Sequence, residues 1–238
     1  MGHDNFCFPV RELSNERVKL MPFDAKIHGP EFFALSSPQP SLYAHIPRGP
    51  YTSLSDFTTN FLEAVIDPSP AWMLYAVIDK TRPSSSPTND PSGALAGTIA
   101  YLDSSPEHLL TEIGFVITLP PFQRTHVTSN AVGLLLQYAL ESPDQAGLGL
   151  RRVQWKANSV NAASRKVAER MGFGLEGVTK WERVFRDGVK KGKVGNGRGV
   201  PPGTEEGDLG RDTATFGLSW EEWRDGGRER VRGVMERL

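Results

Sequence analysis

The feature that most constrains the fold is an alternation of strand-like and helix-like segments between residues 109 and 172. Residues 109–117 form an apolar run between a Ser-Pro pair and Leu-Pro-Pro, which predicts a strand with a sharp end. Residues 127–138 and 160–171 carry apolar side chains at helical spacing, and residues 152–157 between them form a short strand-like run. Gly172 stands where a helix C-terminal glycine belongs. This order of elements predicts an α/β (α+β) fold.

The rest of the chain supplies further strands and one more helix. Residues 17–21 alternate in polarity and predict a first strand, whereas residues 54–66 carry an apolar stripe at helical spacing. Two β-prone runs flank a Pro/Ser-rich stretch and predict a β-hairpin. We therefore expect one mixed central sheet of about seven strands flanked by helices. The remaining predicted strands are residues 72–78, 94–102, 178–185 and 213–218.

Two stretches, residues 80–93 and 186–212, have the composition of long loop insertions. Both are dense in turn-forming residues and lack apolar residues at a helical or strand period. Lys190, Lys191 and Lys193 lie in the second stretch. They could attract acidic partners, but a solvated loop explains them more simply.

Domain organisation and composition narrow the classes of function. Neither insertion is long enough to separate two domains, so we expect a lead-in over residues 1–15, one domain over 16–220 and a C-terminal helix over 221–238. The formal net charge of -1 argues against nucleic-acid binding. The single cysteine, Cys7, cannot form an internal disulfide or a cysteine-based zinc site. No apolar run approaches the ~20 residues of a membrane span. We expect a cytoplasmic monomer or homodimer without a metal.

A helix is predicted to begin near Thr125, directly after a Pro-Pro turn. The first backbone N–H groups of a helix have no internal acceptor, and together with the helix dipole they attract anions. Hydroxyl groups of Thr125, Thr128 and Ser129 and the basic side chains of Arg124 and His126 would strengthen such a site. A capped helix start without any ligand is the alternative.

Glu112 is a carboxylate inside an otherwise apolar strand. Strand alternation places it on the same face as Leu110, Gly114 and Val116. Burial of a carboxylate is costly unless the group is paired or functional, and burial raises its pKa towards the range that suits a general base for an amine. A glutamate that faces water or pairs with an arginine explains the residue equally well.

The segment of residues 158–164 joins a strand to a helix. Ser159 and Asn161 are good N-cap residues, so helix capping is their default interpretation. Ser164 lies one turn further in, where serine is a weak helix former. Its hydroxyl is therefore also a candidate to donate to a ligand.

In combination, these segments resemble the acetyl-CoA core of the GNAT superfamily of N-acetyltransferases, and within it the branch of ribosomal-protein N-terminal acetyltransferases. The matching pieces are the strand Glu-Ile-Gly, the Gln/Arg loop that opens a helix, the Asn-x-x-Ser helix start and the ending Met-Gly-Phe-x-x-Glu-Gly. The resemblance is tight over residues 111–178 and loose over 16–220. It implies a single GNAT-type domain that moves an acetyl group from acetyl-CoA to a primary amine of a small molecule or a protein N-terminus.

The resemblance also implies roles for individual residues. The family holds the acyl-CoA pyrophosphate with main-chain amides of a loop that corresponds to residues 123–128, and it pairs the pantetheine arm with the strand at residues 115–117. Asn161 corresponds to the asparagine that meets the cofactor arm, and Ser164 to a serine that hydrogen-bonds the departing thiolate. The implied cofactor-binding residues are Phe115, Val116, Ile117, Gln123, Arg124, Thr125, His126, Val127, Thr128, Ser129, Asn161 and Ser164.

Several positions depart from the family pattern. His126 and Thr128 fill two loop positions that are small in the family, although an amide can donate whatever its side chain. Ala168 stands where many members have a tyrosine general acid, so that role passes to Ser164 or to water. Arg183, next to Glu182, stands where the branch has a catalytic glutamate, so neither is assigned that role.

The predicted catalytic residues are accordingly Glu112, as a base that acts through water, and Ser164, at the leaving sulfur. The acceptor cannot be read from the sequence. Position in the branch predicts that Tyr43, His45, Trp181 and Phe185 line its site, although packing in the core is the more common role of such aromatic residues. The competing hypotheses are a non-catalytic acyl-CoA-binding or regulatory module and an enzyme that binds no CoA.

Overall fold

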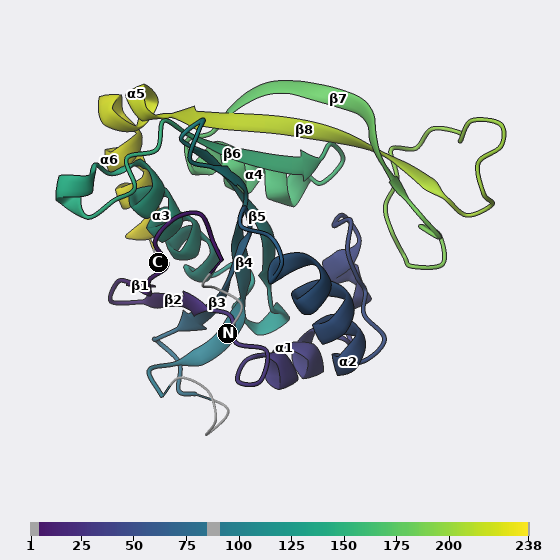
Figure 1. Cartoon of the computed structure of the whole chain (residues 1–238), viewed down its shortest axis with the longest axis horizontal. Helices are drawn as coiled ribbons and strands as arrows, with labels where there is room; N and C mark the ends of the chain where they lie inside the picture. Colours follow the sequence, from purple (N-terminus) through teal and green to yellow (C-terminus); the bar gives the residue numbers. More distant parts are fainter. Residues whose placement is uncertain (1–4, 85–90, 238) are drawn as a thin grey trace.

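A computed structural model describes residues 5–84 and 91–237. One eight-stranded sheet runs through the molecule in the order β1-β2-β3-β4-β5-β6-β8-β7 (Figure 1). Neighbouring strands are antiparallel except β5 and β6, which are parallel. The prediction of a single α/β domain with a mixed sheet is confirmed. The strands are β1 (Leu13–Ser14), β2 (Val18–Pro22), β3 (Met73–Asp79), β4 (Ala94–Ser105), β5 (Leu110–Thr118), β6 (Arg152–Asn158), β7 (Gly174–Phe185) and β8 (Leu209–Ser219).

Helices cover both faces of the sheet (Figure 1). On one face, the Tyr101 hydroxyl of β4 donates to the Leu135 carbonyl of α3, and α6 packs beside α3. On the other face, the ring of Phe61 lies 4.8 Å from that of Phe115 in β5. The helical segments are α1 (Gly29–Ser36), η1 (Pro40–Tyr43), α2 (Leu54–Phe57), η2 (Thr58–Ile66), η3 (Pro120–Phe122), α3 (Val127–Leu140), η4 (Pro143–Gln145), α4 (Ala162–Arg170), α5 (Trp220–Glu222), η5 (Trp223–Gly227) and α6 (Arg228–Met235).

The parallel strands β5 and β6 separate soon after they begin to pair. Their register joins Leu110, Thr111 and Glu112 to residues 152–154 and then stops. From there β6 continues to pair with β8 as far as Asn158, while β5 continues to pair with β4. The β6-facing edge of residues 113–118 is therefore open, and its backbone groups are available to a ligand.

A β-bulge lies within this open stretch. Ala100 of β4 pairs with Gly114, whereas Thr98 pairs with Ile117, so β5 contains one extra residue. Phe115 lies in the bulge, and its backbone φ is 45°. The Thr98 hydroxyl of β4 donates to the Phe115 carbonyl at 3.2 Å and so stabilises the bulge. Gly97 allows the two strands to approach, because a Cβ there would lie 1.9 Å from the Ile117 carbonyl oxygen.

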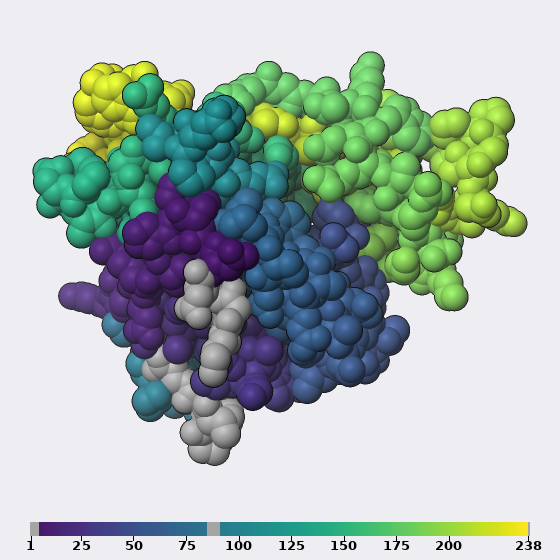
Figure 2. Space-filling model, in the orientation of Figure 1, coloured from purple at the N-terminus to yellow at the C-terminus, as the bar shows by residue number. Residues whose placement is uncertain are grey.

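The two predicted insertions have different outcomes. β3 and β4 pair as the predicted hairpin, and residues 85–90 of the first insertion lie outside the described residues. The second insertion is a loop over residues 186–208, and only its predicted end is wrong, because β8 already begins at Leu209 and pairs with β7 through Phe185. Together β7, β8 and the residues between them form an arm that extends beyond the body of the molecule (Figure 2).

The interpretation of the arm as solvated is also wrong at Lys193. This side chain is only 7% exposed, and its Nζ donates to the carbonyls of Tyr43, Ile46 and Arg48 at 2.8–2.9 Å. Burial, and to a smaller extent Lys191, lowers the Lys193 pKa to about 8. The arm is thus fastened to the chain segment that follows η1, beside which it lies in Figure 2.

Three further boundaries differ from the sequence-based expectations. β1 lies inside the expected lead-in and brings the strand count to eight. β7 begins at Gly174, four residues earlier than predicted, because Gly174 and Gly177 interrupt the alternation of polar and apolar residues that marks a strand. The C-terminal segment is helical but kinked, with Gly226 at a φ of 127°.

Gly97→Ala tests the link between strand packing and the bulge. We expect this variant to lower the free energy of unfolding by at least about 2 kcal/mol, because β4 must move away from the Ile117 carbonyl. Urea denaturation measures the change. Gly177→Ala in β7 is the matched control, since no atom lies within 4 Å of its added Cβ. Equal stability of the two variants would contradict the proposed packing role of Gly97.

Candidate functional site

Two cavities meet at the point where β5 and β6 separate. A smaller one of about 330 Å³ lies between the open part of β5, β6 and the segment after η1. A larger one of about 770 Å³ extends from there along α3 and α4. Residues that line both cavities are Leu42, Val116, Trp155, Asn161 and Ser164. We call the smaller one the acceptor cavity and the larger one the donor groove.

The donor groove brings together most residues predicted to bind a cofactor. Those that line it are Val116, Ile117, Gln123, Arg124, Thr125, His126, Thr128, Ser129, Asn161 and Ser164. Phe115 lies instead in the acceptor cavity, and Val127 is buried behind the groove against β4 and β5. The sequence analysis missed Arg170 and Arg237, which also line it. With Arg124, they give this groove three arginines and no carboxylate among its described lining residues.

The groove wall at the start of α3 is suited to an anion. Backbone amides of residues 124–126, 128 and 129 make no hydrogen bond within the described part of the chain. Arg124 adopts a φ of 60°, which turns the loop into the helix. The Thr125 hydroxyl donates to the Phe122 carbonyl at 2.6 Å and so braces this turn. The wall therefore offers several N–H donors at a helix N-terminus, the arrangement that binds phosphate groups.

Side chains of the two unusual loop residues are bound to the sheet. His126 Nε2 lies 3.2 Å from Oδ1 of Asp79, which is fully buried at the end of β3. The Thr128 hydroxyl forms a 2.8 Å hydrogen bond with the Thr118 hydroxyl of β5. Neither side chain has to move for the loop amides to receive a ligand. The departures at these positions are thus accommodated by contacts with the sheet.

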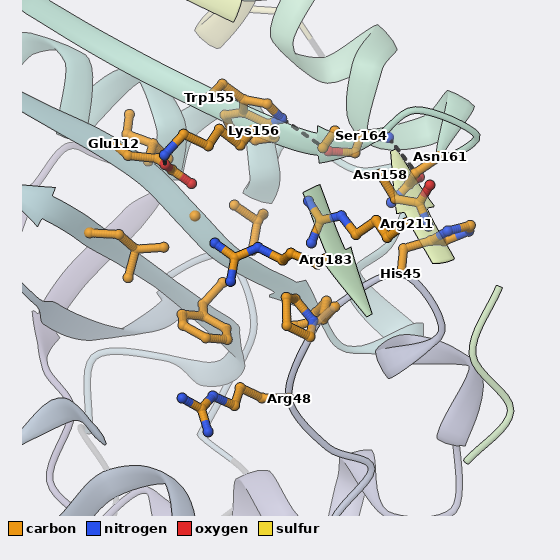
Figure 3. Close-up of a pocket in the computed structure, with 18 of the residues that line it drawn as sticks. His45, Arg48, Glu112, Trp155, Lys156, Asn158, Asn161, Ser164, Arg183 and Arg211 are labelled. Atoms are coloured by element: carbon orange, nitrogen blue, oxygen red, sulfur yellow. Dashed lines mark hydrogen bonds and ion pairs between the residues drawn. The ribbon is translucent and has the colours of Figure 1, made fainter. Parts of the chain in front are cut away.

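Ser164 is held at the junction of the two cavities. Asn161 is the N-cap of α4, and its Oδ1 accepts from the Ser164 amide at 3.1 Å. The Trp155 indole N–H donates to Ser164 Oγ at 3.0 Å (Figure 3). Because the indole nitrogen can only donate, the hydroxyl proton of Ser164 remains available for another acceptor. Ala168, at the position of the family tyrosine, is fully buried in the core.

Glu112 occupies one end of the acceptor cavity. It is 6% exposed, and its Oε2 lies 2.8 Å from the Lys156 ammonium, which also contacts Asp103 at 3.1 Å (Figure 3). Burial raises the pKa of Glu112 above its ordinary value, and Lys156 opposes part of that rise. The carboxyl group is thus both paired and shifted towards the pKa range of a base.

Basic residues occupy the other end of the acceptor cavity. Arg211 of β8 and His45 face it together, and Arg183 lies between them and Glu112 (Figure 3). Arg183 Nε pairs with Glu182 at 3.4 Å. Burial lowers the pKa of Arg211 to about 10, and burial also lowers the pKa of His45, with a further contribution from Arg211.

Of the four residues predicted to line the acceptor site, His45 does so. Tyr43, Trp181 and Phe185 are not among the described residues that line this cavity. The Tyr43 hydroxyl is buried and donates to Ser36 at 3.0 Å. Trp181 packs against Gly210 within the arm, and Phe185 lies beneath the Lys193 ammonium. These three aromatic residues therefore pack within the core or the arm and do not line the acceptor cavity.

Trp155, Lys156, Arg183 and Arg211 complete the acceptor cavity, and the sequence analysis assigned none of them a role. Lys156 lies within a predicted strand and Arg211 lies close to one. A charged residue in a strand was taken as a sign of function only for Glu112. Within residues 5–84 and 91–237, no three His, Cys, Asp or Glu side chains gather as metal ligands. None of the helices in the same residues has the length and hydropathy that a bilayer crossing requires.

Comparison with known families identifies the family of this chain. The family model described as "Acetyltransferase (GNAT) domain" matches residues 17–174. The chain belongs to the GNAT acetyltransferase family. Among curated proteins, no match was found. The family uses acetyl-CoA as the acetyl donor, and the groove described above has donors and charge suited to its phosphates.

Solved structures agree with the family assignment. A GCN5-related N-acetyltransferase from Brucella melitensis is 26% identical, with a TM-score of 0.72 over 96% of this chain and 86% of that one. A probable GNAT acetyltransferase from Chromobacterium violaceum is 29% identical, with a TM-score of 0.70 over 91% and 90%. Spermidine N-acetyltransferase from Vibrio cholerae, in complex with CoA and spermine, shares the fold at 14% identity, with a TM-score of 0.60 over 88% and 99%.

His126→Ala tests whether this side chain is structural. Loss of its contact with buried Asp79 is expected to lower stability by about 1 kcal/mol, while the Kd for acetyl-CoA changes less than about threefold. Thermal unfolding and calorimetric titration measure the two effects. Arg170→Gln is the comparison variant, since that arginine lines the groove. If His126→Ala weakened acetyl-CoA binding more than Arg170→Gln did, the side chain would have to contact the ligand.

Proposed function

We propose that this protein is an acetyl-CoA-dependent N-acetyltransferase that acetylates a primary amine by direct attack in a ternary complex. The observation that carries the proposal is the continuity of the site. An anion-binding helix start, an open strand edge and a cavity with a buried carboxylate follow one another along β5. Donor and acceptor can therefore meet without a covalent enzyme intermediate. Cys7, the only thiol, lines neither cavity.

The donor is proposed to bind along the open edge of β5. Its phosphates fit the amides of residues 124–129 and the three groove arginines. Its pantetheine amides would take the free backbone groups of residues 113–118, as an added strand does. This placement directs the thioester to the bulge, near the Val116 amide and Ser164.

The proposed reaction begins with removal of a proton from the substrate ammonium by Glu112, directly or through water. The free amine then attacks the thioester carbonyl carbon, and the C–N bond forms as negative charge moves to the carbonyl oxygen. The Val116 amide is suited to stabilise that oxyanion. The added nitrogen then releases its second proton to water. Collapse of the intermediate breaks the C–S bond, and the Ser164 hydroxyl donates a hydrogen bond to the departing thiolate. The contact from Trp155 leaves the Ser164 proton free for this step.

A non-catalytic acyl-CoA-binding module is the second candidate, and Ala168 is the observation that favours it. Its methyl group is buried and cannot act as a general acid. The other departures no longer favour this candidate, because His126 and Thr128 are bound to the sheet and the described loop amides keep no internal partner. Membership of the ribosomal-protein N-terminal acetyltransferase branch is supported by the motif order in the sequence and remains a proposal.

The decisive experiment combines acetyl-CoA binding with CoA release over a panel of amines. Wild-type protein is expected to bind acetyl-CoA and to release CoA with at least one amine. Ser164→Ala is expected to lower kcat at least tenfold, about 1.4 kcal/mol, because the thiolate loses its donor. Ser159→Ala, outside both cavities, is the control. Binding without CoA release from any amine would favour the non-catalytic module.

The pH profile tests Glu112 as the base. Because the carboxylate is the active form, kcat/KM is expected to rise with pH through a Glu112 pKa that burial has raised. Lys156→Met removes a cation that favours the carboxylate, so it is expected to move this acid limb to higher pH. Glu112→Gln is expected to lower turnover at least tenfold at pH values above that pKa, and the difference from the wild type is expected to shrink below it, where Glu112 is protonated.

Lys166→Met is the matched control, since this lysine is exposed on α4 and lines neither cavity. It is expected to leave the profile in place. An unmoved acid limb in Lys156→Met, or full activity in Glu112→Gln, would remove Glu112 from the mechanism.

A further inference from the structure

Charged side chains in the acceptor cavity are sorted into two ends of opposite sign. At one end, a single lysine, Lys156, faces two carboxylates, Glu112 and Asp103, which leaves a formal charge of -1. At the other end lies Arg211, beside His45, which gives this end a formal charge of +1; Arg183, which pairs with Glu182, lies between the two ends, and Arg48 lines the cavity away from Arg211. Figure 3 shows Glu112 and Arg211 on opposite sides of the cavity, with Arg183 between them.

Arg211 is the unusual member of the basic end. It is 5% exposed, its side chain makes no hydrogen bond or ion pair with any described residue, and its Nε is fully enclosed. The acidic residues nearest in sequence cannot help. Asp212 points to the other face of β8, where it accepts from Trp181 and Arg198, and Asp208 is paired with Arg186.

An unpaired guanidinium inside a protein reduces stability, because the charge loses its hydration without gaining a partner. Burial accordingly lowers the pKa of Arg211 to about 10. Nδ1 of neighbouring His45 is also buried without a hydrogen-bond partner among the described residues. Two buried groups with unused hydrogen-bonding capacity thus face the same cavity. A planar carboxylate is the ligand that matches the fork of an arginine.

We propose that the acceptor is a small molecule that carries a carboxylate as well as its primary amine, and that Arg211 binds the carboxylate. The amine then lies towards Glu112, at the end of negative charge. This inference rests on the proposed acetyltransferase function and names its substrate class. A cavity of about 330 Å³ is at the lower end of the size range of small-molecule sites, which suits an amino acid better than a folded protein.

The same geometry disfavours amines that lack an acidic group. An alkylamine leaves Arg211 unpaired in the complex. A polyamine places a second cation near Arg211 at the basic end, and like charges in a partly enclosed cavity repel. Selectivity therefore comes from a cost imposed on the wrong acceptor as well as from a contact with the right one.

Matched acceptor pairs test the proposal. Histidine and histamine, phenylalanine and phenethylamine, and lysine and 1,5-diaminopentane each differ only by the carboxylate. In at least one pair, wild-type kcat/KM is expected to be at least tenfold higher for the amino acid. Arg211→Gln is expected to lower that preference ratio at least tenfold, about 1.4 kcal/mol. Arg186→Gln, an exposed arginine outside the cavity, is expected to keep the ratio.

Two measurements separate a folding defect from a loss of recognition. Thermal unfolding and the Kd for acetyl-CoA are both expected to be preserved in Arg211→Gln, since the variant removes a buried charge and leaves the donor groove intact. A preference ratio that is below one in the wild type, or unchanged in Arg211→Gln, would overturn the proposal. So would acetylation confined to peptides.

Failure of the proposed function has a different signature. If acetyl-CoA binds but no amine releases CoA, the enzyme assignment fails, and binding still tests Arg211. Calorimetric titration of the six compounds into the CoA complex should then show binding of an amino acid that Arg211→Gln weakens at least tenfold. Absence of amino-acid binding by the wild-type complex would overturn the assignment of Arg211 as well.

Discussion

The separation of β5 from β6 after Glu112 is the constraint on which the site depends. Backbone groups inside a sheet are normally satisfied on both sides, and here residues 113–118 are satisfied on one side only. The sheet tolerates this because β6 keeps its ladder with β8, and because Thr98 and Gly97 hold the bulged strand against β4. Unused donors and acceptors along that edge are what a ligand with its own amide groups can complete.

The acceptor cavity extends this principle from backbone to side chains. The Lys156 ammonium pairs with two carboxylates, so the charges at the acidic end are largely neutralised without a ligand. Arg211 makes no ion pair or hydrogen bond with a described residue, and the charges of Glu182 and Glu112 offset only part of the cost of its burial, although a strand interior would accommodate an apolar residue at lower cost. Proteins tend to keep locally unfavourable residues where function uses them. A substrate carboxylate that pairs with Arg211 would offset the free-energy cost of burying its guanidinium.

Periodicity predicted the elements around the site because apolar residues there repeat as in regular strands and helices. Glu112 could be singled out as a carboxylate in an apolar strand, but its partner Lys156 could not, since the pairing depends on how β6 lies beside β5. The two strands of the arm were predicted, but the start of β8 at Leu209 was not, because Asp208 and Asp212 hold this part of the arm by polar contacts that leave no apolar pattern. Tyr43 and Phe185 were placed by analogy, and packing alone decided their real positions.

The attachment through Lys193 ties two regions that are distant in sequence. The segment whose carbonyls it binds also contributes His45, Ile46, Pro47 and Arg48 to the wall of the acceptor cavity. No described residue of the arm lines the donor groove. A change in the arm can therefore alter the wall of the acceptor cavity while the lining of the donor groove stays the same.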